Sequence, residues 1–571
     1  MNYQKKNKEK FNRITFLMVI FFIFAGLIIV RLFVLQILQH KNYVDLSADI
    51  HQIYQEIYPK RGEILIQKAT TAETYPIATN HDLYLLYAVP RNVENPEETF
   101  EKLSSVIEIS KEKILSRLSK KNDLYEPIKH YLTEEEMKKI KEFNLKGIKF
   151  STETVRFYPH DNLFSHILGF VGFDKDQLVG RYGLERYFEK QLKGEMGFSN
   201  TRKGAQGNII ITSESKIQEP KNGESIVLTI DESIQFTACQ ELKKGIEKYH
   251  AQGGTIIVME PQTGKILAMC NFPDFNPNKF NESEDINVFN NSAISDSYEP
   301  GSVFKVITMA IGLELNKVTP ETSYVDTGEV RFGGYTIRNF NDKKYGKQTM
   351  TQVLEKSLNT GAVFVANQIE NKVFKKYIED FSFGEKTDIA LPNENPGNIN
   401  SLDKKGKLYI ATASFGQGIS TTPIQLVSAF AAIANQGELM KPYLVDKIIK
   451  DSGEEFKTSP QTVRQVISSK TAMILSGMMA SVIKNGCAKK AGVKNYYMAG
   501  KTGTAQVPGK NGYSNETIQT FIGFGPVENP RFAMLIKLDK PHALDASISA
   551  APIFGKVAEF ILNYYQIPPE K

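Results

Sequence analysis

A serine and a lysine three positions apart, Ser302 and Lys305, stand at the start of an apolar stretch of the chain. Pro300 and Gly301 come directly before them, so the apolar residues 303–315 predict a helix that begins beside Ser302. Residues three apart lie on one face of a helix, and a lysine in apolar surroundings loses its proton far more readily than in water. The pair therefore offers a nucleophile and a nearby base, the first requirements of acyl transfer through a covalent intermediate.

The Ser-x-x-Lys spacing is not specific by itself. It also occurs at Ser110–Lys113, Ser213–Lys216, Ser401–Lys404 and Ser481–Lys484. A serine at a helix start is more often an N-cap than a nucleophile. The assignment of Ser302 therefore depends on the motifs that accompany it.

Two further motifs follow Ser302 along the chain. The sequence Ser-Leu-Asn at 357–359 lies in a second predicted helix, 350–367, and Lys-Thr-Gly-Thr at 501–504 lies in a predicted β-strand. Taken singly, the first motif could cap a helix and the second could be the polar edge of a strand. The three motifs in this order, the first on a helix and the third on a strand, are the signature set of penicillin-binding proteins and serine β-lactamases.

The elements expected to position these motifs occupy residues 222–571. The sequence predicts strands at 224–231, 253–261, 264–272, 495–507, 520–527 and 531–539, and helices at 232–249, 303–315, 350–367, 424–435, 470–485 and 553–565. Strands at both ends with helices between them indicate an α+β domain, in which an antiparallel sheet is flanked by helices and carries an inserted helical lobe.

The segment 40–220 is mixed and highly charged. Helices are predicted at 98–118 and 134–143, and short strands at 51–59 and 82–89. No residue pattern in this segment indicates chemistry. It is therefore predicted to be a separate α+β spacer domain.

The first 36 residues predict a membrane anchor. Residues 1–13 carry most of the formal net charge of +6, and an apolar run at 14–36 follows them. Such a run is long enough to span a bilayer as a helix, and its basic flank predicts a cytoplasmic N-terminus. A cleaved signal peptide is the alternative, but the apolar run is longer than usual for one and lacks a small-x-small cleavage site. The rest of the chain is nearly neutral, which argues against a nucleic-acid partner.

The cysteines predict neither a metal site nor a disulfide. Cys239, Cys270 and Cys487 are far apart and form no Cys-x-x-Cys pair. They also lack a metal-ligand spacing with the scattered histidines. We expect buried, small hydrophobic side chains and a protein stabilised by packing.

The wider sequence resembles class B penicillin-binding proteins over nearly its whole length. The catalytic part is similar to their transpeptidase domain in GGTIIVMEPQTGKILAMCNFPDFNPN, SYEPGSVFK, FGQGISTTPIQLVSAFAAIANQGELMKPYLV, AGKTGTAQ and TFIGFGPVENPR. The segment 40–220 resembles their non-catalytic pedestal, or dimerisation, domain in RGEI, RFYPHDNLFSHILGFVG and GLERYFEKQLKG. One stretch departs from the family pattern: LIQKATTAET replaces the usual turn after RGEI, so the local hairpin is not predicted there.

The resemblance implies a mechanism for the first two motifs. Lys305 would take the proton of Ser302, which would attack the carbonyl of the penultimate D-Ala of a peptidoglycan stem peptide. Backbone N–H groups of Ser302 and Thr504 would form the oxyanion hole, and Ser357 would relay the proton to the departing D-Ala. An amine of a second stem peptide would then resolve the acyl-enzyme and make a cross-link.

The resemblance also assigns the remaining motif residues. Asn359 would orient the peptide backbone, and Lys501 would tune the proton relay through its charge. Thr502, Gly503 and Thr504 would form the substrate-binding strand, with the two threonine hydroxyls on the terminal carboxylate. β-Lactams would mimic the acyl donor, and no cofactor or metal is implied.

Location and partners follow from the same resemblance. It implies a single-pass protein of the cytoplasmic (inner) membrane, with the catalytic domain on the outer or periplasmic side. A polytopic glycan polymerase and other cell-wall assembly proteins are the implied partners. The sequence Glu-Pro-Gly-Ser at 299–302, the chain length and the short stretch after Lys501 favour the division (septal) type over the elongation type.

Two other functions are open at this point. A β-lactamase or D,D-carboxypeptidase would need a base that directs water onto the acyl-enzyme, and no Glu-x-x-Leu-Asn-like element occurs between the second and third motifs. An idle scaffold or β-lactam receptor would share the sequence without the activity. All motif positions are intact, which favours the transpeptidase.

Overall fold

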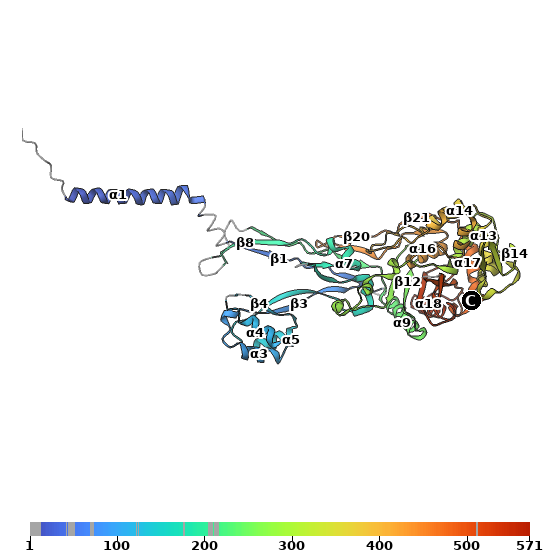
Figure 1. The fold of residues 1–571 in the computed structure, drawn as a ribbon, viewed down its shortest axis with the longest axis horizontal. Helices are drawn as coiled ribbons and strands as arrows, with labels where there is room; N and C mark the ends of the chain where they lie inside the picture. Colours follow the sequence, from blue (N-terminus) through green and yellow to red (C-terminus); the bar gives the residue numbers. More distant parts are fainter. Residues whose placement is uncertain are drawn as a thin grey trace, which may run out of the picture. The chain divides into compact units, whose positions relative to one another are not determined.

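The computed structural model describes residues 13–41, 43, 52–68, 73–121, 123, 125–174, 177–203, 209–210, 216–509 and 512–570. The chain forms two compact units. Met1–Pro59 and Glu195–Lys221 make up the first, and Lys60–Gly194 and Asn222–Lys571 make up the second (Figure 1). These units cut across the predicted segments 40–220 and 222–571, whose boundaries stay a prediction.

The first unit contains the apolar helix and a small sheet. Helix α1 (Arg13–Phe33) continues as the π-helical segment η1 (Val34–Leu38), and together they are long and apolar enough to cross a membrane once. Most of the basic tail, residues 1–12, lies outside the described residues. The sheet has the order β1-β8-β10, with β9 paired to β8. Its strands are β1 (Gln52–Ile57), β8 (Gly197–Lys203), β9 (Ile209–Ile210) and β10 (Lys216–Gln218).

The second unit begins with a mixed sheet of order β20-β19-β11-β2-β3-β4, in which β5 also pairs with β3. The strands are β2 (Ile64–Gln67), β3 (Thr74–Ala88), β4 (Glu126–Leu132), β5 (Ile148–Phe157), β11 (Ser225–Leu228), β19 (Val445–Ile449) and β20 (Glu455–Lys457). Strand β11 pairs with both β2 and β19, so this sheet joins the catalytic segment to the earlier one. Strands β2 and β3 form a hairpin at the stretch where the sequence departs from the family pattern.

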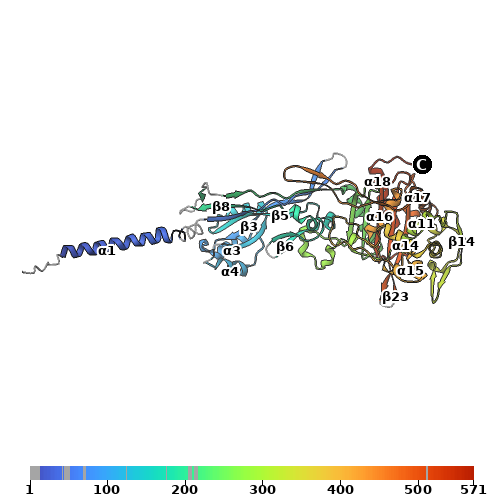
Figure 2. The same cartoon turned by 90° about the horizontal axis from the view of Figure 1, so that it is seen from above.

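Three helices pack beside β3 and β4 around a core of their own, as both views show (Figures 1 and 2). They are α3 (Pro96–Ser104), α4 (Lys111–Leu118) and α5 (Glu134–Glu142). The single helix predicted at 98–118 is wrong, because the chain leaves the helix after Ser104 and buries Ile107 before α4 begins. The shorter elements after β5 are α6 (Ser165–Leu168), β6 (Val171–Asp174), β7 (Gln177–Gly180), α7 (Gly183–Tyr187) and α8 (Glu189–Leu192).

A buried ion cluster ties these segments together. The Glu185 carboxylate accepts hydrogen bonds from Arg61 Nε at 2.7 Å and Arg156 Nε at 2.6 Å, and its residue is fully buried. Burial acts to raise the pKa of Glu185, but the two arginines outweigh it and hold that pKa below its usual value. Arg61 is the arginine of the RGEI motif, so this motif has a structural role at the base of β2.

The catalytic sheet is antiparallel, with the order β13-β12-β24-β23-β22. Its strands are β12 (Gly253–Met259), β13 (Ile266–Phe272), β22 (Ala499–Gly509), β23 (Gly512–Gly525) and β24 (Phe532–Asp539). Helices α9 (Glu232–Tyr249) and α18 (Ala550–Tyr564) pack together on one face. Helices α16 (Pro423–Ala434) and α17 (Ser469–Lys484) contact β12, β24, β23 and β22 and each other. The predicted sheet flanked by helices is confirmed.

The helical lobe carries the first two motifs. Its elements are α10 (Ser292–Ser295), α11 (Lys305–Glu314), α12 (Met350–Glu355), α13 (Asn359–Ala366), α14 (Asn371–Asp380) and α15 (Lys407–Ala413). It also contains two antiparallel strand pairs. Strand β14 (Ser323–Asp326) pairs with β17 (Gly346–Thr349), and β15 (Glu329–Phe332) pairs with β16 (Tyr335–Arg338). A third pair, β18 (Glu438–Met440) and β21 (Thr462–Gln465), follows later in the chain. The one helix predicted at 350–367 is wrong, because Ser357 has a φ of 56° and the chain turns there between α12 and α13.

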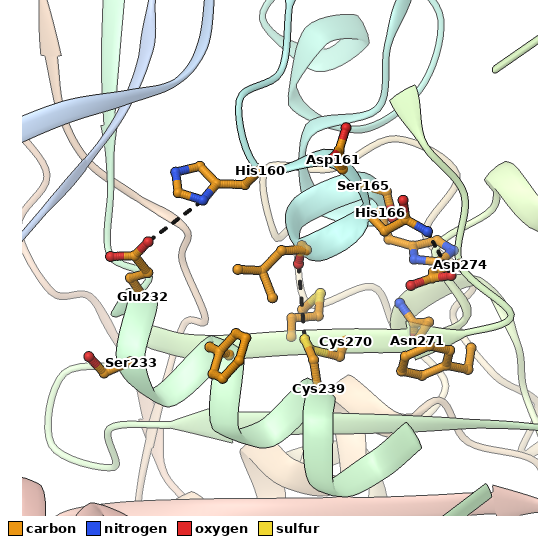
Figure 3. Close-up of a pocket in the computed structure, with 15 residues that line it drawn as sticks. His160, Asp161, Ser165, His166, Glu232, Ser233, Cys239, Cys270, Asn271 and Asp274 are labelled. Atoms are coloured by element: carbon orange, nitrogen blue, oxygen red, sulfur yellow. Dashed lines mark hydrogen bonds and ion pairs between the residues drawn. A yellow bond between two sulfur atoms is a disulfide. The ribbon is translucent and has the colours of Figure 1, made fainter. Parts of the chain in front are cut away.

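The prediction of three isolated cysteines is wrong. Cys239 of α9 and Cys270 of β13 form a disulfide, with Cα atoms 5.5 Å apart (Figure 3). Helix packing on the sheet brings these residues together, although they are 31 positions apart in the sequence. The disulfide lies at the wall of a cavity of about 660 Å³ between residues 160–166, the start of α9 and the end of β13.

Candidate active site

The first motif lies where a 3-10 turn becomes a helix. The turn η6 (Gly301–Phe304) leads directly into α11, which begins at Lys305. Lys305 Nζ lies 2.9 Å from Ser302 Oγ. Gly301 has a φ of 58°, which glycine adopts without strain and which turns the chain into this geometry.

The hydroxyl group of Ser357, in the second motif, is within hydrogen-bonding distance of a lysine from each of the other two motifs. Lys305 Nζ lies 3.2 Å from Ser357 Oγ and 2.5 Å from the Ser357 carbonyl oxygen. Lys501 Nζ, from the edge strand β22, lies 2.9 Å from the same Ser357 Oγ. The left-handed conformation of Ser357 places it at the end of α12, between the two lysines. Residues that are far apart in the sequence thus form one hydrogen-bonded chain from Ser302 to Lys501.

Both lysines are buried, with exposed fractions of 1% for Lys305 and 0% for Lys501. Burial lowers the pKa of Lys305 well below its usual value, and the nearby Lys501 lowers it further. Burial also lowers the pKa of Lys501, and the nearby Cys487 and Asp545 offset part of this lowering. Because a neutral amine carries a free lone pair, Lys305 is suited to accept the proton of the Ser302 hydroxyl.

The remaining predicted residues surround this chain of hydrogen bonds. The Asn359 side chain donates through Nδ2 to the carbonyl oxygen of Arg338 at 2.7 Å. Thr502 Oγ1 lies 3.4 Å from Lys501 Nζ, and Thr504 Oγ1 accepts a hydrogen bond from the Ala546 backbone at 3.4 Å. All eight residues predicted from the three motifs therefore lie in η6, at the start of α11, in the turn before α13, at the first residue of α13, or in β22.

The sequence matches two protein families. Residues 254–559 match the family described as penicillin binding protein transpeptidase domain, and residues 56–228 match the penicillin-binding protein dimerisation domain. The first match alone covers more than half of the chain. The chain belongs to the class B penicillin-binding proteins.

Relatives of this penicillin-binding protein cover almost all of it. Stage V sporulation protein D of Bacillus subtilis is 34% identical over 552 residues, which are 95% of this chain and 84% of the relative. The probable peptidoglycan D,D-transpeptidase PenA of Neisseria meningitidis is 30% identical over 576 residues, 99% of this chain and 95% of the relative. The protein is accordingly a serine-type transpeptidase.

Solved structures agree on the fold of this penicillin-binding protein. A peptidoglycan synthetase from Bifidobacterium adolescentis has a TM-score of 0.72 at 25% identity, covering 91% of this chain and 98% of its own. Penicillin binding protein 2X from Streptococcus thermophilus has a TM-score of 0.75 at 23% identity, covering 90% of this chain and 80% of its own. The predicted order of apolar helix, dimerisation domain and transpeptidase domain is confirmed.

The structure adds residues to the site of this penicillin-binding protein that the motif analysis missed. The Glu299 carboxylate accepts hydrogen bonds from the Gly418 backbone at 2.9 Å and from the Tyr513 hydroxyl at 2.9 Å. Burial raises the pKa of Glu299, since it disfavours the charged form. Glu299 thereby links the chain just before Ser302 to the β22–β23 hairpin. Its position three residues before the nucleophile was the only sequence signal.

Cys487 is a second missed residue. Its exposed thiol lies 3.4 Å from Thr502 Oγ1, beside the predicted substrate-binding strand. Cys487 was expected to be buried, and that expectation is wrong. The turn after α17 brings this thiol to β22, a contact that sequence spacing does not reveal.

A side chain at Gly503 is expected to slow acylation of the nucleophile. A Cβ atom there would meet Val303 Cγ1 at 2.9 Å and the Pro300 carbonyl oxygen at 3.0 Å. The variant Gly503→Ala would push β22 away from η6, so we expect the acylation rate by a fluorescent penicillin to fall about 10- to 100-fold. Stopped-flow fluorescence checks this. Gly477→Ala, where a Cβ would meet nothing within 4 Å, is the matched control and is expected to leave the rate unchanged.

Proposed function

We propose that this protein cross-links peptidoglycan stem peptides through an acyl-enzyme on Ser302, with release of D-Ala. The observation that carries the proposal is the shared hydrogen-bond chain in which Lys305 Nζ reaches both Ser302 Oγ and Ser357 Oγ, and Lys501 Nζ reaches Ser357 Oγ. The relatives' names support the substrate. PenA is named a probable peptidoglycan D,D-transpeptidase, and FtsI of Escherichia coli, 30% identical over 434 residues, is named a peptidoglycan D,D-transpeptidase.

In the acylation step, Lys305 Nζ takes the proton of the Ser302 hydroxyl. Ser302 Oγ bonds to the carbonyl carbon of the penultimate D-Ala, and the amide C–N bond to the terminal D-Ala breaks. The proton then passes from Lys305 through the Ser357 hydroxyl to the leaving nitrogen. The 3.2 Å distance from Lys305 Nζ to Ser357 Oγ supports this relay.

Backbone N–H groups of Ser302 and Thr504 would stabilise the oxyanion that forms on the attacked carbonyl. Thr502 and Thr504 hydroxyls would bind the terminal carboxylate, beside the positive charge of Lys501. Asn359 would orient the stem-peptide backbone, and Gly503 allows the close approach of β22 to η6. β-Lactams would acylate Ser302 as mimics of the same donor.

In the second step, the amine of a neighbouring stem peptide attacks the ester carbonyl of the acyl-enzyme. The C–N bond of the cross-link forms as the C–Oγ bond breaks, and the proton of the amine returns to Ser302 through Lys305. These two reaction steps use no cofactor, and the protein residues that take part in them all lie in the part of the chain that the structure describes.

We further propose the location and partners of the enzyme. The apolar helix α1 supports a single-pass anchor in the cytoplasmic membrane, with a cytoplasmic N-terminus and the catalytic domain outside. A polytopic glycan polymerase would bind through this helix and the 40–220 pedestal, and the catalytic domain would occupy 222–571. The Glu-Pro-Gly-Ser sequence at 299–302 supports septal wall synthesis.

Intact-protein mass spectrometry tests the catalytic proposal. Wild-type protein incubated with a fluorescent penicillin is expected to gain one adduct that is lost slowly, and Ser302→Ala is expected to gain none. Ser401→Ala, which removes the serine of another Ser-x-x-Lys motif, is expected to keep the adduct. A folded wild-type protein without an adduct would indicate an idle scaffold, and rapid turnover of the drug would indicate a hydrolase.

Two measurements test the location and the partner. A fluorescent fusion is expected to gather at division sites, whereas an even distribution along the lateral wall would contradict the septal role. Replacing residues 14–36 by an unrelated membrane helix is expected to release the polymerase in co-purification. Full retention of the polymerase after this swap and after deletion of the pedestal would refute the proposed interface.

A further inference from the structure

A buried carboxylate lies beneath the second motif. Asp326, the last residue of β14, is 2% exposed. Four donor groups surround it: the backbone N–H of Gly328 at 3.0 Å, the backbone N–H of Tyr345 at 2.9 Å, the side-chain amide of Asn339, and the hydroxyl of Thr360 at 2.8 Å. Within the described part of the chain, no lysine or arginine forms an ion pair with Asp326.

Asn339 extends this network from the carboxylate to the backbone of helix α13. Its Nδ2 donates to both Asp326 oxygens, at 2.9 and 3.0 Å, and its Oδ1 accepts from the Thr360 backbone N–H at 3.2 Å. Asn339 and Thr360 are 5% and 2% exposed. The side chains of Asp326, Asn339 and Thr360 are therefore shielded from bulk solvent, so each hydrogen bond between them is costly to lose.

The network holds Asn359 from two sides. On one side, Thr360 is its neighbour in the first turn of α13 and is bonded directly to Asp326. On the other side, the Arg338 carbonyl, which accepts the Asn359 amide at 2.7 Å, immediately precedes Asn339 in the chain. A change at Asp326 would thus move both the backbone of Asn359 and the acceptor that orients its side chain.

The buried carboxylate of Asp326 connects three separate segments of the chain through hydrogen bonds. Asp326 ends β14, Asn339 follows β16, and Thr360 is the second residue of α13. A buried carboxylate that relies on four neutral donors is stable only while all of them stay in place. The arrangement therefore specifies one geometry for the start of α13, and it would resist small displacements of that start.

We propose that Asp326 is a positioning residue for acylation, which acts by fixing Asn359 through Asn339 and Thr360. This inference rests on the proposed function, because it assumes that Asn359 orients the acyl donor. It assigns a purpose to the hairpin segment 323–349, which contains none of the three motifs. Asp326 touches neither the nucleophile nor the base, so its effect on the reaction is indirect.

Acylation kinetics of the full-length protein in detergent test the inference. In Asp326→Asn one acceptor oxygen is replaced by an amide donor while the side-chain volume is kept. This amide faces Asn339 Nδ2 and either the Tyr345 N–H or the Gly328 and Thr360 donors, so the network loses at least two of its hydrogen bonds. We expect the second-order rate constant with a fluorescent penicillin to fall about 10- to 100-fold. Asp342→Asn is the matched control, since Asp342 lies in the same segment with its side chain 72% exposed, and it is expected to leave the rate unchanged.

A double-mutant cycle separates positioning from general loss of structure. If Asp326 acts through Asn359, then Asp326→Asn will cost little further rate in the Asn359→Ala background. A destabilised fold would instead lower the rate by the same factor in both backgrounds. Thr360→Val, which removes a different donor of the network, is expected to show the same dependence on Asn359.

Each outcome has one meaning. An unchanged rate in Asp326→Asn, or an equal loss in the two backgrounds, overturns the inference while the proposed function stands. A wild-type protein that is not acylated overturns the proposed function and this inference with it. A large loss that disappears when Asn359 is already alanine supports the positioning role.

Discussion

Replacing Lys305 by alanine is expected to slow acylation of Ser302 by about 10³-fold, within the usual range for loss of a general base. Lys305 Nζ is 2.9 Å from the Ser302 hydroxyl and links it to Ser357, so the variant loses both the base and the relay. Stopped-flow measurement with a fluorescent penicillin gives the rate. Lys404→Ala, the exposed lysine of another Ser-x-x-Lys motif, is expected to match wild type.

The pH dependence gives a second readout for the same residue. The lowered pKa of Lys305, due to burial and then to Lys501, means that its amine stays neutral to a lower pH than a free lysine. The acylation rate is therefore expected to fall as the pH drops through this lowered pKa. The variant Lys501→Gln removes the positive charge that lowers the pKa of Lys305, so this pKa rises. The fall of the acylation rate on acidification, the acidic limb of the pH profile, therefore moves to higher pH. A limb that stays in place would show that Lys305 is not the titrating base.

Replacing Glu185 by glutamine is expected to lower the free energy of unfolding of the second unit by about 3–5 kcal/mol, the usual cost of removing one partner of a buried ion pair. Arg156 and Arg61 have side chains only 3% and 12% exposed, and their charges would lose the carboxylate between them. Urea unfolding followed by circular dichroism measures the loss. Glu98→Gln, at an exposed pair with Lys102, is the control and is expected to leave the unfolding midpoint unchanged.

The sign of the pH effect follows from the lowered pKa of Glu185. Its contribution to stability is fully present above the unfolded pKa of a glutamate, roughly 4.3, and is lost as the pH falls through the lower folded pKa. The wild-type protein should therefore lose more stability on acidification than Glu185→Gln. Parallel pH profiles for the two proteins would contradict this account.

The helix boundaries show where sequence patterns were sufficient. The predicted helix 232–249 agrees with α9, whose start is capped by the Asp231 carboxylate, which accepts a hydrogen bond from the Ile234 backbone N–H. A cap and a periodic apolar face act within a few residues, so they are visible in the sequence. The predicted helix 350–367 failed at Ser357, which has a left-handed φ of 56° and contacts Lys305 and Lys501 from elsewhere in the chain. The local apolar pattern carries no information about either feature.

The sequence by itself determined the family, the order of the domains and the three motifs, since these depend on residue type and on short spacings. The tertiary structure alone decided that Lys501 reaches Ser357, that Cys239 bonds to Cys270, and that the thiol of Cys487 lies beside Thr502. It alone revealed the carboxylate of Asp326 beneath Asn359. The physical reason is that a helix or strand fixes only its own near neighbours, whereas contacts between distant segments, and the pKa shifts they cause, arise from packing and burial.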